Sequence, residues 1–363
     1  MIYKYKLNFL ISFIAIAVMQ IKTAETLKIG YLSSWNIRCG IATYTKNICE
    51  ALKQTEYLPI VYNNKMSSKE IIEKIKSDNI KILNIQFEPA LYDYFDFKKL
   101  LKKIKQLKIK IILTVHTEIE EIKKIEKFID YFIFHKIPKF FSNRKNINII
   151  PIGAPVFKLP KDRNEIRKKY DFSPNDIILT TFGLMAKWKK NSEILKSFVP
   201  LLKKNPDYRI QLLTSFSDID FKQSMKENKK INSVIKNYNL KKQITYITDF
   251  LPENELNERL WISDLGYLWC DLNSSGSSAA RKQFISARLP LITTNSPHYH
   301  DFFYGVYRTK MNMNAFLRAI KENLNNTDNL LLLREDMNTA YNILNFEKLI
   351  HQHIRIFNKI LNQ

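Results

Sequence analysis

Residues 27–52, LKIGYLSSWNIRCGIATYTKNICEAL, show the pattern that decides the fold. They start with a short apolar run, 27–32, which has the length of a strand and is bounded by small residues. A turn around Gly40 follows, and 43–52 then carries apolar residues at helical spacing. A strand, a turn and an amphipathic helix make up half of a βαβ unit. The segment therefore predicts a parallel sheet covered by helices.

The same alternation recurs along the chain and is interrupted once, at the charged, proline-containing residues 158–169. We therefore expect an α/β protein of two Rossmann-like domains facing a cleft, 27–157 and 165–335. A ligand should bind at the carboxyl ends of the strands. The predicted strands are 27–32, 58–62, 80–87, 109–115, 131–134 and 148–152, then 177–182, 208–214, 244–247, 265–270 and 289–293.

The composition is that of a globular protein, with 45% hydrophobic and 26% charged residues among 363. Aromatic residues at 12% exclude a disordered chain, and only 7 glycines exclude a collagen-like one. The 58 Lys and Arg against 35 Asp and Glu leave a net charge of +23. This charge attracts phosphates, nucleotides and anionic membrane surfaces. No nucleic-acid-binding motif accompanies it, so we expect no nucleic-acid partner.

Residues 1–26 precede the predicted fold and contain an apolar stretch, 7–21, behind Lys4 and Lys6. The stretch is shorter than the ~20 apolar residues that span a bilayer. With an Ala-Ile-Ala sequence at 15–17 it resembles a cleaved signal peptide, whereas its retention would make it a membrane anchor. The three cysteines have neither disulfide nor zinc spacing, which favours a reducing compartment. We expect a cytoplasmic protein at the inner face of the membrane, with signal-peptide export as the alternative.

Three loops after predicted strands carry candidate chemistry. In the first, Gly40 opens a helix whose N–H groups suit an anion, although an ordinary turn would look the same. In the second, Lys187 and Lys189 would hold a diphosphate by charge, the alternative being a solvated loop. In the third, residues 273–280 surround Gly276 with serines. Their amides would bind a phosphate at a helix start, or cap the helix without a ligand.

Six segments carry a resemblance to a known family. They read GY…CGIATYT at 30–45, NIQFE at 84–88, LTVHT at 113–117, IPIG at 150–153, TFG…K at 181–189 and SSG…PLIT at 274–293. In this order they resemble the bacterial retaining glycosyltransferases of family 4, which have the GT-B architecture.

The resemblance implies a membrane-associated enzyme of the cell-envelope polysaccharides. It would transfer a hexosyl-type sugar, with retention, from a nucleotide sugar to a lipid-linked or polysaccharide acceptor. It would need no cofactor and no metal. Residues 336–363 would form helices that cross back to the first domain.

The resemblance also implies roles for single residues. Gly40, with Cys39 and Ile41, would lie near the donor phosphates and the transferred sugar, which His116 would reach from the first domain. Lys189 would offset the charge of the departing diphosphate. The catalytic set would thus be His116, Gly40 and Lys189. The other donor-binding residues would be Gly183, Lys187, Ser275, Gly276, Ser277, Ser278 and Gln283.

The chain departs from the family pattern at four positions. Ala186 replaces an arginine, for which the adjacent lysine could substitute. Ser275 and Gln283 replace two glutamates, and Arg288 replaces a glycine. The departures leave a degenerate, non-catalytic sugar-nucleotide-binding member as one alternative. An exported sugar- or lipid-binding protein is the other, if residues 1–24 are cleaved.

Two metal-like patterns and one helix have ordinary alternatives. The pair of aspartates at 218 and 220 and the cluster at 298–301 could bind a metal, but solvated loops are the preferred reading. Residues 97–110 contain seven lysines, no acids and apolar residues at helical spacing. Such a helix suits an anionic membrane surface, or packs on a core with a solvated face.

Overall fold

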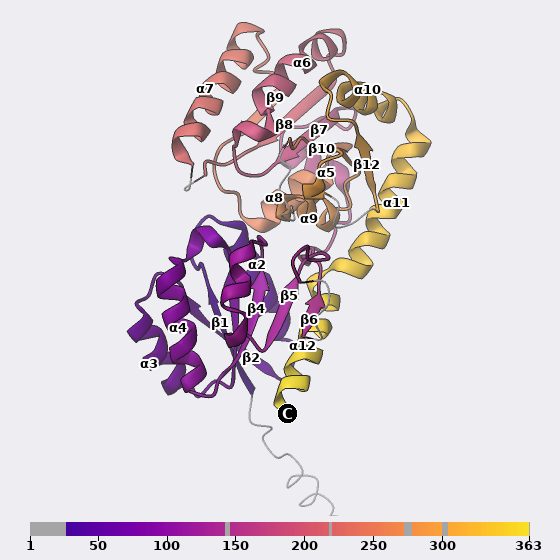
Figure 1. Ribbon diagram of the computed structural model, residues 1–363. Coiled ribbons are helices and arrows are strands. Elements are labelled where there is room, and N and C mark those ends of the chain that lie inside the picture. The colour runs from indigo at the N-terminus through magenta and orange to yellow at the C-terminus, as the bar shows by residue number, and fades with distance from the viewer. Residues whose placement is uncertain (1–26, 142–145, 218–219, 272–277, 300–303, 363) are drawn as a thin grey trace, which may run out of the picture.

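The computed structural model describes residues 27–141, 146–217, 220–271, 278–299 and 304–362. They form two α/β domains, each built on a six-stranded sheet (Figure 1). Within both sheets the paired strands are parallel. Parallel strands covered by helices on both faces read as continuous apolar runs, which is why the sequence locates them. The predicted fold class is confirmed.

The N-terminal sheet has the order β2-β1-β3-β4-β5-β6. Two core clusters lie on its faces, one with α3 and α4 and the other with α2. The elements are β1 (Leu27–Ser33), α2 (Gly40–Leu52), β2 (Tyr57–Asn63), α3 (Ser68–Asp78), β3 (Ile82–Phe87), η1 (Pro89–Leu91), α4 (Tyr94–Gln106), β4 (Lys110–Val115), η2 (Glu120–Lys124), η3 (Glu126–Phe128), β5 (Tyr131–Phe134) and β6 (Ile147–Ile149).

The C-terminal sheet has the order β12-β11-β10-β7-β8-β9, the Rossmann arrangement with β7 and β10 at its centre. Strand β12 was not predicted, because its four residues form no apolar run. The elements are α5 (Arg163–Lys169), β7 (Ile177–Phe182), η4 (Lys187–Lys189), α6 (Asn191–Lys204), β8 (Tyr208–Leu213), α7 (Phe221–Asn237), β9 (Ile244–Ile247), α8 (Glu253–Trp261), β10 (Leu265–Leu268), α9 (Ala279–Ser286), β11 (Leu291–Thr294), η5 (Pro297–Tyr299), β12 (Val306–Thr309), α10 (Met313–Leu324) and α11 (Thr327–Leu344).

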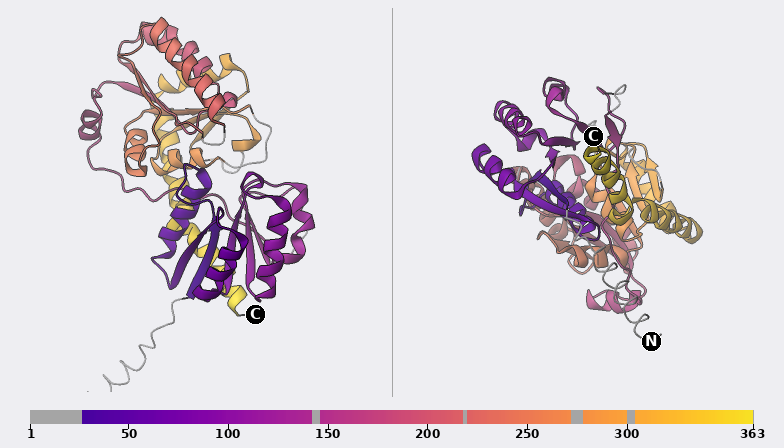
Figure 2. Two further views of the ribbon diagram at one scale, coloured as in Figure 1. Left: turned by 90° about the vertical axis from the view of Figure 1, so that its left-hand side faces the viewer. Right: turned by 90° about the horizontal axis from the view of Figure 1, so that it is seen from below.

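The last two helices connect the domains. Helix α11 packs in a core cluster of the C-terminal domain, and α12 (Phe346–Leu361) packs on the N-terminal domain against α2. The yellow helices run from one domain to the other along one side of the molecule (Figures 1 and 2). The backbone of Ala154 fixes the crossing point, since its N–H donates to Leu344 at 2.8 Å and its carbonyl accepts from Phe346 at 3.1 Å.

Helix α4 decides between the two alternatives for residues 97–110. Its N-cap is Asp93, whose carboxylate accepts from two backbone N–H groups. Its apolar face, with Phe97, Leu100 and Ile104, is buried in the domain core, so α4 is a packed helix with a solvated lysine face. Among the described residues, no helix combines the length and apolarity needed to span a membrane.

Candidate functional site

A cleft of about 800 Å³ lies between the two domains. The loop that follows β7 and the start of α9, the helix after β10, form much of its C-terminal wall. These two strands are neighbours from which the chain winds in opposite directions, and such a switch point opens a crevice at the carboxyl ends of the strands. The facing wall includes the β1–α2 loop, with Trp35 and Arg38, and the start of α2. The predicted place of ligand binding therefore coincides with a real cavity.

Lys189 is the most unusual side chain in this cleft. It is only 8% exposed, and burial lowers the pKa of its ammonium group to about 8. Among the described residues it forms no ion pair with a carboxylate. Gly183, with φ +124°, leaves the space that the ammonium occupies, because a Cβ there would lie 2.5 Å from Nζ. A buried cation beside an open cleft is suited to receive an anion.

Two helix amino ends meet beside this lysine. Helix α2 starts at Gly40 and α9 starts at Ala279, and a Cβ on Gly40 would lie 3.6 Å from the Cβ of Ala279. Ala280 in turn lies 3.5 Å from the position of a Cβ on Gly183. Helix amino ends carry partial positive charge and free N–H groups. Two such ends and one lysine therefore converge on a single region of the cleft.

The charges on the cleft wall are strongly unequal. Its cationic side chains are Arg38, Lys46, Lys189 and Lys282, and among the described residues Glu253 is the one carboxylate that lines it. Glu253 also connects the domains, since its Oε1 accepts from Asn47 at 3.5 Å. This imbalance favours an anionic ligand.

Lys282 is a residue that sequence reasoning missed. It lies in the first turns of α9, is 1% exposed and lines the cleft beside Gln283. A signal was present, because two adjacent basic residues near a helix start oppose the helix dipole and need another reason to be there. The buried Oε1 of Gln283 has no hydrogen-bond partner among the described residues, so it is available to accept from a ligand hydroxyl.

His116 does not line the cleft but lies behind Tyr44, which does. Its ring packs edge-on against Tyr44, a wall residue, with ring centroids 5.1 Å apart. Its Nε2 lies 3.0 Å from Gln86 Oε1 and its Nδ1 lies 3.3 Å from Nε2 of His135. Burial, reinforced by His135, holds the pKa of His116 well below its usual value, so the ring is neutral at pH 7.

Of the other predicted site residues, some line the cleft, some lie away from its wall and some fall outside the described ranges. Gly40, Gly183, Lys189, Ser278 and Gln283 line the cleft together. Lys187 is exposed and does not line it, whereas Lys282 does. Cys39 and Ile41 are also absent from the wall. Cys39 is instead the N-cap of α2, where its Sγ accepts from the N–H of Ile41 at 3.3 Å.

Several predicted residues lie outside the described ranges. They are Ser275, Gly276 and Ser277 of the serine loop, Asp218 of the aspartate pair, and His300 and Asp301. Among the described residues, no group of three or more His, Cys, Asp or Glu side chains has the geometry of a metal site.

Arg288 does not line the cleft. Its backbone has φ +53°, the left-handed conformation that glycine adopts most easily. Its guanidinium stacks 3.4 Å from the ring centroid of Tyr341 and donates to the carbonyl of Phe157 at 2.8 Å. Arg288 therefore connects the linker, at Phe157, with α11, at Tyr341.

No family model matches the sequence, and no curated protein matches it. Solved structures do match. A glycosyltransferase from Rickettsia africae has a TM-score of 0.69 at 16% identity, covering 93% of this chain and 99% of that one. Anabaena HepE in complex with UDP and glucose has 0.69 at 10% identity, covering 92% and 100%. An alpha,alpha-trehalose-phosphate synthase (UDP-forming) from Burkholderia vietnamiensis has 0.67 at 11%, covering 92% and 100%. At such identities the likeness shows the fold, two Rossmann-like domains in the GT-B arrangement.

Proposed function

We propose that the chain is a glycosyltransferase of the family 4 type. It moves a sugar from a nucleoside-diphosphate sugar to a lipid-linked or polysaccharide acceptor, with retention at the anomeric carbon. The observation that carries the proposal is the meeting of Lys189 with the amino ends of α2 and α9 in the interdomain cleft.

The reaction needs positive charge at this place, because negative charge develops on the diphosphate as it leaves the sugar. Groups that are fixed before the reaction stabilise such a charge with little reorganisation. Lys189, Lys282 and the helix amides offer this charge, and we propose that no metal ion is required. An arriving diphosphate raises the pKa of the buried Lys189 ammonium and so keeps it protonated.

The donor sugar would lie between this cluster and the N-terminal wall. There Tyr44 contacts the neutral His116, which we propose to orient toward the sugar when the domains close. UDP-sugars are the first donors to test, because HepE was solved with UDP and glucose and the similar trehalose-phosphate synthase is UDP-forming. Since nucleotide sugars are cytoplasmic compounds, the location that we propose is the cytoplasmic face of the membrane.

Gln283 favours a second function, binding of a sugar nucleotide without efficient transfer. Its amide oxygen accepts a ribose hydroxyl more weakly than the glutamate of the family would. A Gln283→Glu variant distinguishes the two. If the wild-type chain turns over a donor, the first function holds. If turnover appears only in the variant, the natural chain is a binding protein.

A thermal-shift screen of the chain against UDP, GDP, ADP and their sugars tests the proposal. A ligand at 100 times its dissociation constant stabilises by about 2.7 kcal/mol. We expect a shift with one base, lost in Lys189→Ala and kept in Lys187→Ala, which removes an exposed lysine of the same loop. An equal shift in both variants, or none with any nucleotide, contradicts the proposal. For an active pair, the anomeric configuration of the product tests retention.

A further inference from the structure

The N-terminal domain exposes large apolar side chains that the cleft does not use. Phe95 is 72% exposed, Ile137 76% and Phe140 41%. Single exposed apolar residues are ordinary, but these three lie in segments that follow neighbouring strands, Phe95 in the first turn of α4 and the other two in a loop. Phe95 follows β3, and the other two follow β5. Strands β3, β4 and β5 are adjacent and parallel, so the loops at their carboxyl ends share one edge of the sheet.

Direct contacts connect these loops. Glu118, which follows β4, accepts from the backbone N–H groups of Lys139 and Phe140, both at 2.8 Å. The ammonium of Lys123 in η2 lies 5.3 Å from the ring centroid of Phe140. The β5 loop is therefore held against the β4 loop at Lys139 and Phe140. The side chains of Ile137 and Phe140 are exposed there, whereas Phe141 is buried.

The start of α4 joins the same edge. Burial raises the pKa of Tyr94, and the negative charge of Glu121 in η2 raises it further. Phe95, the next residue, packs against Tyr94 with ring centroids 5.9 Å apart. Because α4 follows β3 after a short connection, Phe95 lies near the carboxyl end of that strand, on the same side of the sheet as the β4 and β5 loops.

Helix α4 adds a line of charge to this surface. Phe95, Lys98, Lys99 and Lys102 have the spacing i, i+3, i+4, i+7, which places them on one stripe, and all four are exposed. The apolar residues of the opposite face are in the core. Two carboxylates at the start of this helix are engaged locally, since Asp93 caps the helix and Asp96 pairs with Lys99 at 3.1 Å.

We propose that this surface docks on an anionic lipid bilayer. Its residues, named here the docking patch, are Phe95, Lys98, Lys99, Lys102, Ile137 and Phe140. The lysines would lie against the anionic headgroups, and the three apolar side chains would enter the interface. The proposal rests on the proposed function, in which the acceptor is lipid-linked, and it adds the surface that would bring the enzyme to that acceptor. The apolar face of α4 remains in the domain core in this arrangement, and only the lysine stripe of that helix faces the membrane.

Tryptophan fluorescence tests the insertion directly. In the full chain we compare Phe95→Trp with Phe221→Trp, the matched control. Phe221 is 54% exposed at the start of α7, another lysine-bearing helix, on the other domain (Figure 1). With vesicles of phosphatidylcholine and phosphatidylglycerol, we expect a blue shift and quenching by brominated lipid at position 95 and neither at 221. The wild-type chain, with its four tryptophans, supplies the background signal that is subtracted from both variants. The remaining signal reports contact at position 95 or 221, whatever residues 1–26 do.

Charge removal tests the electrostatic part. Each surface lysine contributes about fivefold to anionic vesicle affinity. Lys98→Gln with Lys102→Gln should therefore weaken binding to the same vesicles by about 25-fold. Lys222→Gln with Lys226→Gln on α7 should leave it unchanged. The proposal is overturned if brominated lipid does not quench the tryptophan at position 95, or if both lysine-pair variants lose the same vesicle affinity. The first result would also be expected if the patch binds a protein instead of a bilayer. Because these assays contain no nucleotide, their failure leaves the thermal-shift result of the proposed function untouched.

Discussion

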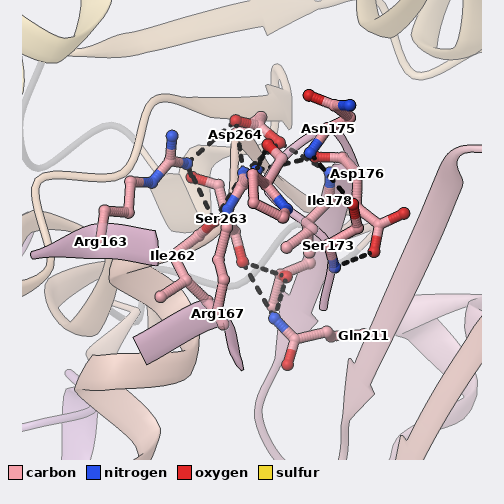
Figure 3. A network of polar contacts seen from close by, with 12 residues as sticks. Arg163, Arg167, Ser173, Asn175, Asp176, Ile178, Gln211, Ile262, Ser263 and Asp264 are labelled. Atoms are coloured by element: carbon pink, nitrogen blue, oxygen red, sulfur yellow. Dashed lines mark hydrogen bonds and ion pairs between the residues drawn. The ribbon is translucent and has the colours of Figure 1, made fainter. Parts of the chain in front are cut away.

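The two ends of the C-terminal sheet carry positive charge in opposite ways. At the amino ends of β7 and β10, Asp264 pairs with Nη2 of both Arg163 and Arg167 at 2.9 Å and accepts from the N–H of Ile178 at 2.7 Å (Figure 3). At the carboxyl ends, Lys189 is buried in the cleft with no carboxylate partner among the described residues. The charge at the first site stabilises the fold, whereas the charge at the second is left for a ligand.

The pKa values of Arg167 and Lys189 show this difference. Burial lowers the pKa of Arg167, but the carboxylate of Asp264 opposes that effect. For Lys189, burial lowers the pKa to about 8 without such compensation. A paired charge should therefore stabilise the native state, and the unpaired one should destabilise it until an anion binds.

Removing the shared carboxylate should have the largest effect. Asp264→Asn leaves the two arginines and the neighbouring Arg334 without their counter-charge, and breaking a buried pair costs about 3–5 kcal/mol. Urea unfolding measures the loss. The control is Glu50→Gln, which breaks an exposed pair with Lys53 and should cost at most about 0.5 kcal/mol. Similar losses in both variants would mean that the network adds nothing beyond a surface pair.

Removing the unpaired charge of Lys189 should have the opposite effect and stabilise the native state. Lys189→Met should raise the free energy of unfolding by about 1–3 kcal/mol at pH 7, since a desolvated charge disappears. The unfolded lysine, with pKa about 10.4, binds more protons than the folded one. Wild-type stability relative to the variant should therefore rise with pH between about 8 and 10.4. A variant that is less stable at every pH would show that Lys189 is structural.

Gly183→Ala should disturb the lysine through the backbone. The φ of +124° is unfavourable for alanine, with a cost of about 1–2 kcal/mol, and the new Cβ would displace the Lys189 ammonium. We expect lower stability together with weaker nucleotide affinity, measured by urea unfolding and by thermal shift. The matched change is Gly305→Ala, which also has a positive φ, at +64°, and whose Cβ would meet Met337. Neither residue lines the cleft, so the effect of this change should be on stability alone.

Arg288→Gly should have the smallest effect. It relieves the left-handed strain at φ +53° but removes the contacts with Tyr341 and Phe157. These opposing terms should leave stability within about 1 kcal/mol of wild type. Nucleotide affinity should not change, because Arg288 does not line the cleft. A gain in affinity would show that the arginine shapes the donor site at a distance.

The sequence located the sheets better than the site. Apolar runs mark strands that are buried on both faces, so they were found, whereas β12 with Tyr307 and Arg308 offered no such run. In the cleft, the loop position of Lys187 suggested a phosphate ligand, yet its side chain points to solvent. Lys282 was overlooked because a lysine on a helix is ordinarily exposed, and only the turn of α9 into the cleft buries it.

The most direct test of the cleft as a diphosphate site is calorimetric titration with UDP near pH 9, in two buffers of different ionisation enthalpy. If the phosphates bind beside Lys189, its pKa rises and the complex should take up close to one proton, as the difference between the buffers measures. Lys189→Met should show weaker binding without that uptake. Binding with equal affinity and equal proton uptake in both chains, or no binding of any nucleoside diphosphate, would contradict this assignment.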